Sequence, residues 1–269
     1  MSSDIGRRAR LARLFHPASG RQINVAADHG NFGLLAGVED VARVLAAVVP
    51  GGPDSIQLPP GSARIYQSMA GHRPPLVLRL DRTNCYARPA PGGTYDALIA
   101  GVEAAVRLDA AAVVVNLLAI PGEDAVTAQC VENIALVREE CDRYSMPLMV
   151  EPLLFTPDGG TDRTTASVAA RVREACESGA DLVKCDYTES GFERVVEAAG
   201  PVPVSVRGGD VREPIEMFRA VKRALDAGAR GITFGRNIVR AADPARTIRA
   251  YARMVHAGGT PEEALALLG

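Results

Sequence analysis

Residues 181–186, Asp-Leu-Val-Lys-Cys-Asp, decide the fold, because they form a short apolar run of strand length with a lysine, Lys184, inside it. Seven further runs of similar length are spaced roughly 25 to 35 residues apart along the chain, at 23–27, 55–58, 76–80, 112–117, 147–153, 202–206 and 231–234. Each is followed by Gly, Pro, Asn or Asp and then by a stretch with helical periodicity. This alternation is typical of repeated strand–helix units.

The stretches between these runs predict the helices of the same units, at 38–49, 95–108, 125–144, 165–178, 191–199 and 214–227. Two of them end at a glycine, in Ser178-Gly179 and Ala227-Gly228, as expected for a helix C-terminus. Strands that are apolar at nearly every position are buried on both faces, which indicates a parallel sheet covered by helices. Eight such strands predict an α/β fold of the (β/α)8, or TIM barrel, type.

An open, doubly wound sheet is the alternative architecture. Its first strand–helix turn would be residues 27–33, which lack the glycine spacing of a dinucleotide-binding fingerprint. The length of 269 residues and the 47% of hydrophobic residues suit one barrel domain with a sizeable core. We therefore expect a single domain over residues 1–269, with residues 1–20 as an N-terminal helical extension.

The charge balance and the cysteines restrict the partners and the compartment. A net charge of −2 provides no broad basic field, so neither nucleic acid nor anionic lipid is an expected partner. No apolar run reaches the length of a membrane span, and residues 1–15 lack the apolar core of a secretory signal. Five scattered cysteines without CxxC spacing fit a reduced, cytoplasmic setting.

Lysine is unusually rare in this chain. Of the 30 basic residues only two are lysines, Lys184 and Lys222, and the remainder are arginines. Because arginine supplies nearly all positive charge, a lysine retained inside an apolar strand is informative. Lys222 lies in a predicted helix, where we expect an ordinary solvent-exposed residue.

Active sites of (β/α)8 barrels lie at the C-terminal ends of the strands, so the polar residues at those ends are the candidates. They are Asp28 and His29 on the first strand, Arg79, Asp81 and Arg82 on the third, Asn116 on the fourth, Glu151 on the fifth, Lys184, Asp186 and Tyr187 on the sixth, Arg207 on the seventh, and Arg236 and Asn237 on the eighth. The loop at 155–164, after the fifth strand, is placed where a cover of the active site would lie.

A lysine that points into the barrel occupies a region of low dielectric, which disfavours its charged form and leaves a nucleophilic amine. Such an amine suits Schiff-base chemistry with a carbonyl substrate. The alternative is that Lys184 forms an ion pair with Asp28, Glu151 or Asp186 and has no chemical role. Burying that charge without a function is costly, which favours the first interpretation.

Glycines follow the last two strands. Gly208-Gly209 and Gly235-Arg236-Asn237 are placed where many barrels bind phosphate through backbone N–H groups, and Arg236 adds a cation for a phosphate oxygen. The alternative is that these glycines only allow tight turns. Their occurrence after both expected strands favours phosphate binding.

Four motifs together resemble those of the DeoC/LacD-type class I aldolase superfamily: Asp28-His29-Gly30, Asp181-Leu182-Val183-Lys184, Arg207-Gly208-Gly209 and Gly235-Arg236-Asn237. The resemblance extends over essentially the whole chain. It is strongest to the DhnA-like branch, which includes archaeal-type fructose-bisphosphate aldolases, aminodideoxyheptulosonate synthases and the thiolase that degrades phosphorylated autoinducer-2. It implies a Schiff base on Lys184, an acid at Asp28, and a phosphate cradle of Gly208, Gly209, Gly235 and Arg236.

The sequence departs from this family at two strands. Archaeal-type members usually carry a tyrosine acid/base late on strand five, whereas this chain has Glu151-Pro152-Leu153. Glu151 resembles instead the strand-five glutamate of tagatose-bisphosphate aldolases, beside their Schiff-base lysine. On strand seven, Arg207 replaces a small serine-like residue and adds a cation for a substrate carboxylate or second phosphate.

The proton-transfer group is therefore open between Glu151 and Asp28, with Tyr187 as a further candidate. A structural ion pair of Glu151 with Lys184 or Arg207 is the alternative role for that carboxylate. Arg79 and His29 are predicted substrate contacts. Residues around Arg79, including Asn84 and Tyr86, either recognise substrate hydroxyls or belong to an ion-pair cluster at the rim.

These residues predict a lyase, a class I aldolase that cleaves or forms a carbon–carbon bond in a ketose-phosphate substrate. We expect no cofactor and no metal, because only His29 of the four histidines follows a predicted strand directly. The alternatives are acyl transfer from a phosphorylated diketone, as in the thiolase relative, and a sugar-phosphate binding barrel without turnover. The resemblance also implies a homo-oligomer.

Overall fold

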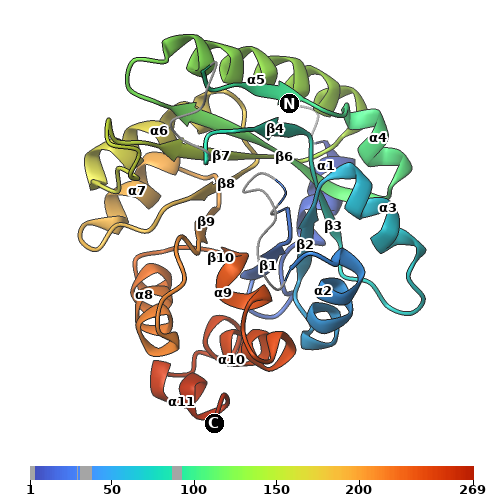
Figure 1. The fold of residues 1–269 in the computed structure, drawn as a ribbon, viewed down its shortest axis with the longest axis vertical. Coiled ribbons are helices and arrows are strands. Elements are labelled where there is room, and N and C mark those ends of the chain that lie inside the picture. The colour runs from blue at the N-terminus through green and yellow to red at the C-terminus, as the bar shows by residue number, and fades with distance from the viewer. Residues whose placement is uncertain (1–3, 29, 31–37, 87–92) are drawn as a thin grey trace.

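The predicted strands form one closed parallel barrel, as the computed structural model shows for residues 4–28, 30, 38–86 and 93–269 (Figure 1). The strands follow one another around the barrel in the order β1-β10-β9-β8-β7-β6-β3-β2. Their bounds are β1 Gln22–Ala26, β2 Ser55–Leu58, β3 Leu76–Arg79, β6 Ala110–Ala119, β7 Leu148–Leu154, β8 Leu182–Cys185, β9 Val204–Arg207 and β10 Gly231–Phe234. The (β/α)8 prediction is confirmed, and the open sheet is excluded.

Helices surround the barrel and cover the outer faces of its strands (Figure 1). They are α1 Ile5–Ala12, α2 Val41–Val48, the 3-10 turn η2 Val49–Gly51, α3 Pro60–Ser68, α4 Val102–Arg107, α5 Asp124–Tyr144, α6 Thr165–Glu177, α7 Phe192–Ala199, α8 Pro214–Asp226, α9 Arg236–Val239, α10 Pro244–Val255 and α11 Pro261–Ala266. The predicted glycine ends are confirmed, because Gly179 and Gly228 have φ values of +95° and +105° after α6 and α8. Among these described helices, none is both long and apolar enough to cross a membrane.

One predicted helix is partly wrong. Residues 96–98, expected at the start of a helix over 95–108, form strand β5 (Asp96–Leu98), and the helix α4 begins only at Val102. β5 pairs antiparallel with β4 (Asp81–Thr83), so a small hairpin interrupts the connection between β3 and α4. This correction also moves Asp81 and Arg82 from the end of the third barrel strand to the hairpin. Long-range pairing between two three-residue strands overrides the local helical pattern.

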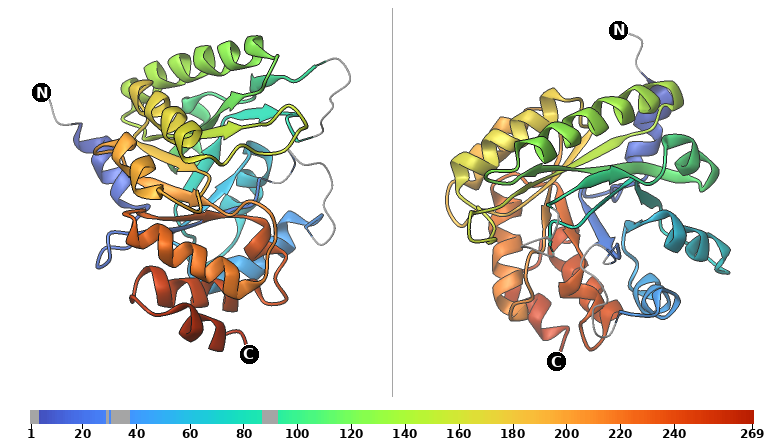
Figure 2. Two further views of the ribbon diagram at one scale, coloured as in Figure 1. Left: turned by 90° about the vertical axis from the view of Figure 1, so that its left-hand side faces the viewer. Right: turned by 45° about the horizontal axis from the view of Figure 1, so that its top comes forward.

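The two ends of the barrel differ in polarity. At the end where α1 lies, Leu14 is fully buried against apolar side chains of the barrel, among them Val77, Ala112 and Leu182. Figure 2 shows α1 in dark blue on the side of the barrel opposite the β4–β5 hairpin. The end near α1 is therefore closed by apolar packing around Leu14, whereas the buried charged side chains of the barrel, Asp28, Arg79, Glu151 and Lys184, lie toward the C-terminal ends of the strands.

Candidate active site

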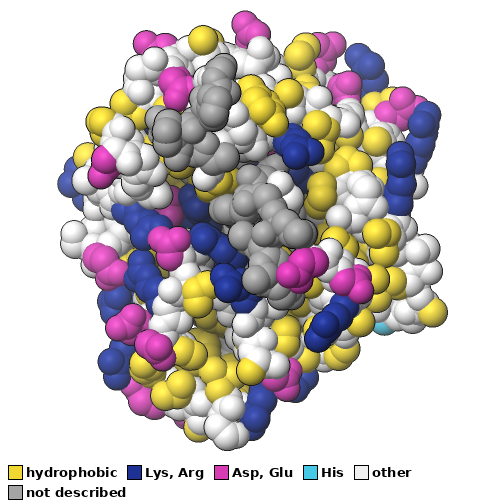
Figure 3. All heavy atoms as spheres, viewed as in Figure 1, with side chains coloured by type: hydrophobic (Ala, Val, Ile, Leu, Met, Phe, Trp, Pro, Cys, Tyr) yellow, Lys and Arg dark blue, Asp and Glu magenta, His cyan; other side chains and the backbone are white. Residues whose placement is uncertain are grey.

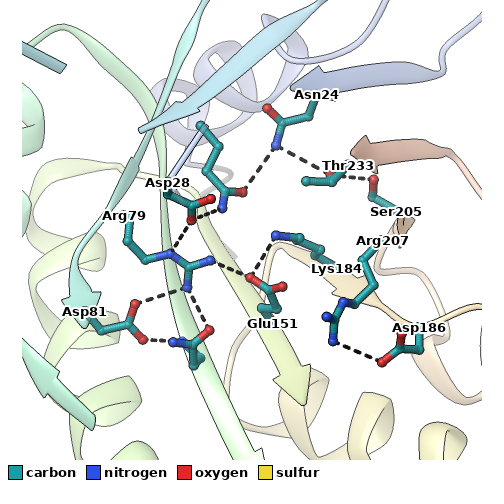
Figure 4. A network of polar contacts seen from close by, with 12 residues as sticks. Asn24, Asp28, Arg79, Asp81, Glu151, Lys184, Asp186, Ser205, Arg207 and Thr233 are labelled. Atoms are coloured by element: carbon teal, nitrogen blue, oxygen red, sulfur yellow. Dashed lines mark hydrogen bonds and ion pairs between the residues drawn. The ribbon is translucent and has the colours of Figure 1, made fainter. Parts of the chain in front are cut away.

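Arg79 is the centre of a buried polar network at the C-terminal end of the barrel (Figure 4). Its side chain is only 3% exposed, and its guanidinium donates to Asp28 (2.9 Å), Asp81 (3.1 Å), Asn116 (2.8 Å) and Glu151. These partners come from four different segments of the chain, so one cation joins several strand ends. A buried arginine whose three guanidinium nitrogens all donate to oxygen atoms is rigid, and it fixes the carboxylates around it.

Lys184 lies beside this network. Its Nζ donates a 2.9 Å hydrogen bond to Oε2 of Glu151, the same oxygen that accepts from Arg79. Both side chains are almost fully buried. The strand register explains the contact, since β7 and β8 pair at Val150 and Val183, one position before Glu151 and Lys184. The predicted neighbourhood of lysine and glutamate is thus present.

The Glu151 carboxylate is held in its ionised form. Burial raises its pKa, but the positive charges of Lys184, Arg79 and Arg207 outweigh burial and hold the pKa below its usual value. A carboxylate with this environment is a weak base. It is suited to stabilising a cation on the lysine nitrogen.

Asp28, at the end of β1, is the second carboxylate of the site. Its Oδ2 accepts from Nε2 of Gln57 at 2.6 Å as well as from Arg79. Gln57 lies on β2 and is itself contacted by Asn24 from β1. The sequence prediction omitted Gln57, although a glutamine inside the run Ser55–Leu58 was a visible signal. His29 lies outside the described residues.

Arg207, at the end of β9, forms part of a second ion-pair group. Its guanidinium contacts Oδ2 of Asp186 at 3.2 Å, and Arg163 contacts the other oxygen of Asp186 at 3.3 Å. Burial lowers the pKa of Arg207. Asp186 and other nearby groups raise it by more than burial lowers it, so the pKa lies above its ordinary value. Arg163 comes from the loop after β7 and was not predicted as a site residue. One carboxylate thus faces two guanidinium groups.

The glycine-rich turns after β9 and β10 are tied to each other. Arg236 donates to the carbonyl of Gly209 (2.9 Å), and Asn237 donates to the carbonyl of Gly208 (3.2 Å). A Cβ on Gly208 would lie 3.1 Å from Phe234 and from Asn237, and Gly209 has a φ of +61°. Any larger residue at 208 would therefore crowd the turn, and position 209 favours glycine.

One pocket brings the predicted residues together. Its lining comprises Ala26, Asp28, Arg79, Tyr86, Asn116, Glu151, Lys184, Arg207, Gly208, Gly209, Thr233, Gly235 and Arg236. This set includes all the predicted catalytic and phosphate-binding residues that the structure describes, whereas the strand-end candidates Asp81, Arg82, Asp186, Tyr187 and Asn237 are not part of the lining. Four of the lining side chains are cations and two are carboxylates, a difference of two positive charges. Figure 3 shows basic side chains gathered near the middle of this face.

Three further candidates from the sequence, Tyr187, Asn84 and Tyr86, lie in different places relative to the pocket. Tyr187 points away from the pocket, because its hydroxyl accepts a 3.0 Å hydrogen bond from Arg223 on α8. Asn84 bonds the backbone of Gly93 and Tyr95 and so holds the hairpin region. Tyr86, in contrast, lines the pocket.

Known proteins and a family pattern match most of the length of this chain. The sequence pattern of the DeoC/LacD family aldolases matches residues 21–241. An uncharacterized aldolase of Saccharolobus solfataricus is 34% identical, over 98% of this chain and 99% of its own. The 3-hydroxy-5-phosphonooxypentane-2,4-dione thiolase of Yersinia enterocolitica is 31% identical, over 99% of this chain and 88% of its own.

Solved structures agree with these relatives. The structure of an archaeal fructose 1,6-bisphosphate aldolase superimposes with a TM-score of 0.79 and 29% identity, covering 94% of this chain and all of that one. A Schiff-base-forming fructose-1,6-bisphosphate aldolase gives the same TM-score with 28% identity, covering 93% of this chain and all of its own. Both similarities extend over more than nine tenths of this chain.

Proposed function

The chain belongs to the DeoC/LacD aldolase family and is a lyase of the class I aldolase type, and from this premise we propose that Lys184 forms the Schiff base with a phosphorylated ketose. One observation carries the proposal: the amine of Lys184 reaches the pocket from β8 and lies 2.9 Å from an ionised carboxylate. The chain's other lysine, Lys222, lies on the outer helix α8. Lys184 is thus the one lysine that lines the pocket.

The proposed chemistry begins at the amine. The unprotonated amine of Lys184 attacks the ketone carbon, and transfer of its N–H proton to the former carbonyl oxygen gives a carbinolamine. Loss of water gives a protonated imine, which draws electrons from the adjacent carbon–carbon bond as that bond breaks. Glu151, kept ionised by its cationic neighbours, stabilises the positive charge of this imine.

The phosphate of the substrate is proposed to bind at the turns after β9 and β10. Gly208, Gly209 and Gly235 line the same pocket as Lys184, and Arg236 supplies a cation beside them. The excess of two positive charges in the lining favours a substrate with more than one anionic group. Arg207 is the proposed partner of the second anion, a carboxylate or another phosphate.

A phosphorylated diketone is the second candidate substrate. The observation that favours it is the 31% identity to a protein named as a thiolase for 3-hydroxy-5-phosphonooxypentane-2,4-dione. The same lysine and the same cradle would serve, with an acyl group passed to a thiol carrier. Incubation with such a diketone and coenzyme A, followed by assay for acyl-coenzyme A, distinguishes this activity from aldol cleavage.

Borohydride trapping tests the proposal. The protein is incubated with dihydroxyacetone phosphate or fructose 1,6-bisphosphate, reduced with borohydride and mapped by mass spectrometry. We expect a reduced adduct on Lys184 in the wild type and in Lys222→Arg, and none in Lys184→Arg. A wild-type protein that traps none of a panel of ketose phosphates contradicts the proposal, and it would favour a binding barrel without turnover.

A further inference from the structure

Schiff-base aldol chemistry needs a group that gives up a proton and later takes it back. Carbinolamine loses water only after its hydroxyl is protonated, and carbon–carbon cleavage requires removal of a hydroxyl proton. The two carboxylates of the pocket are poorly placed for both tasks. Glu151 accepts from Lys184 and Arg79, and Asp28 accepts from Gln57 and Arg79, so each is engaged as an ionised acceptor.

The other residues that line the pocket offer few candidates for the proton donor. Arginines retain their protons, and the described lining otherwise offers two hydroxyl groups, on Thr233 and Tyr86. Thr233 is hydrogen-bonded to Ser205 inside the barrel, and an aliphatic hydroxyl is far too weak an acid for this purpose. A phenol, with an ordinary pKa of about 10, is the acid of suitable strength.

We propose that the Tyr86 hydroxyl is the proton donor and acceptor of the Lys184 reaction. The inference rests on the proposed function and adds a residue that reaches the pocket from the connection after β3, where β4 and β5 form the hairpin. The fifth strand of the barrel, β7, carries Glu151-Pro152-Leu153 at the position expected for an aromatic acid, so Tyr86 would supply the acid that this strand lacks.

The Tyr86 ring is held from two sides of the pocket. Its ring packs edge-on against Phe155, with centroids 6.2 Å apart and planes at 68°, and Phe155 follows β7 directly. Just before it, the backbone N–H of Cys85 donates to the Thr83 hydroxyl, which in turn donates to the Tyr95 carbonyl. The phenol is therefore attached to a hydrogen-bonded hairpin, and its ring packs edge-on against the residue that follows β7.

The charges around the phenol suit a reversible proton donor. Burial raises the pKa of Tyr86 well above its ordinary value, so the resting enzyme holds the proton. Arg207 acts in the opposite direction and lowers the pKa, because its guanidinium stabilises a phenolate. Arg207 therefore opposes the effect of burial, and it would stabilise a phenolate formed during turnover.

The proton and electron balance closes over two steps. In the first, the Tyr86 hydroxyl protonates the carbinolamine oxygen, the C–O bond breaks, and water leaves as the nitrogen lone pair forms the protonated imine; Tyr86 becomes a phenolate. In the second, this phenolate takes the proton of the hydroxyl next to the cleaved bond. The bonding electrons move to the imine, giving an enamine and an aldehyde, and the phenol is restored.

Tyr86→Phe tests the inference, because it removes the hydroxyl and keeps the ring contact with Phe155. We expect kcat for fructose 1,6-bisphosphate cleavage to fall by roughly 10²- to 10⁴-fold, with KM little changed. The rate of borohydride trapping on Lys184 should fall in parallel, since borohydride reduces the imine and not the carbinolamine. Tyr95→Phe is the matched control, because Tyr95 belongs to the same connection and is half exposed.

The outcomes separate this inference from the proposed function. If wild type traps substrate and Tyr86→Phe traps and turns over within about threefold of it, Tyr86 is not the proton donor and the Schiff-base proposal stands. If Tyr86→Phe loses activity but traps at the wild-type rate, Tyr86 acts elsewhere and the inference is wrong. If wild type itself traps nothing, the proposed function fails. Tyr86→His, which restores a dissociable proton, should recover part of the trapping rate lost in Tyr86→Phe.

Discussion

The chain's two lysines form nearly the same ion pair in opposite surroundings. Lys184 is 7% exposed and donates to Glu151 at 2.9 Å, whereas Lys222 is 40% exposed and donates to both oxygens of Asp226, one turn along α8. The contact geometry is as good at the surface as in the barrel. What differs is the exposure of the two pairs to water, which decides how much each pair contributes to stability.

In water a pair such as Lys222–Asp226 contributes little, typically about 0.3 to 0.5 kcal/mol for partners four residues apart on a helix. In the barrel, removal of water from both charges is costly, and only additional hydrogen bonds offset that cost. Arg79 supplies them by bonding Glu151, Asp28, Asp81 and Asn116. The buried pair is therefore maintained by a whole network, as expected where a charge is retained for chemistry.

The largest expected effect is on turnover when each lysine is replaced in turn. Lys184→Arg keeps the charge but removes the primary amine, so aldol cleavage should fall by about 10⁴-fold or more. Lys222→Arg should leave kcat and KM within about twofold. Both are measured by steady-state assay with fructose 1,6-bisphosphate. Equal activities of the two variants would remove the functional distinction between the lysines.

The next effect concerns the partners of the lysines. Glu151→Gln should lower kcat by roughly 10²-fold, because the protonated imine loses the carboxylate that stabilises it. It should lower the free energy of unfolding by about 3 kcal/mol, because Arg79 and Lys184 lose the negative charge that they share. Asp226→Asn should change the free energy of unfolding by less than about 0.5 kcal/mol. Urea denaturation at neutral pH measures both. A Glu151→Gln protein as stable as Asp226→Asn would show that the buried pair is not held by its charges.

A third comparison contrasts a cation in the pocket with one just outside it. Arg236 lines the pocket, while Arg240, four residues later at the end of α9, is exposed. Arg236→Gln should raise KM for a phosphorylated ketose about 10-fold, the size expected for one charge-assisted hydrogen bond, with a smaller change in kcat. Arg240→Gln should leave KM unchanged. A similar rise in both variants would indicate general attraction rather than a defined phosphate contact.

Much of the barrel could be predicted from the sequence, because its strands are buried on both faces and read as continuous apolar runs. The same logic placed Asp28, Arg79, Glu151, Lys184 and Arg207 at one end, since parallel strands all end on the same side. The structure places all five in one pocket. These positions follow from strand topology alone, without knowledge of individual contacts.

The remainder depends on contacts between distant segments. The β4–β5 hairpin was missed because three-residue strands carry too few positions to show a period of two. Arg163 was missed because it comes from a loop, and only the folded chain places it 3.3 Å from Asp186. The contacts of Arg79 with four side chains could not be predicted either, since these partners are distant in sequence or lie beyond the end of its strand.

The last prediction concerns a buried carboxylate whose pKa is shifted without an ion pair. Asp96 on β5 is buried beside Asp81 and accepts from Asn116 (3.3 Å) and Asn133 (3.0 Å). Burial, and then the neighbouring charge of Asp81, raise the pKa of Asp96 to about 7, above the ordinary 3.8. The folded protein therefore holds a proton between pH 4 and 7 that the unfolded chain has released.

Because the folded state binds the extra proton, this contribution to stability is complete below pH 3.8 and is lost as the pH rises through about 7. Asp96→Asn cannot titrate, so its unfolding free energy should decline less steeply between pH 4 and 7, by up to about 1 kcal/mol per pH unit. Urea denaturation at pH 4, 5, 6, 7 and 8 measures the two curves, with Asp226→Asn as the exposed control that should run parallel to wild type. If Asp96→Asn also runs parallel to wild type across this range, burial does not shift the titration of Asp96, and the difference between interior and surface is confined to the ion pairs.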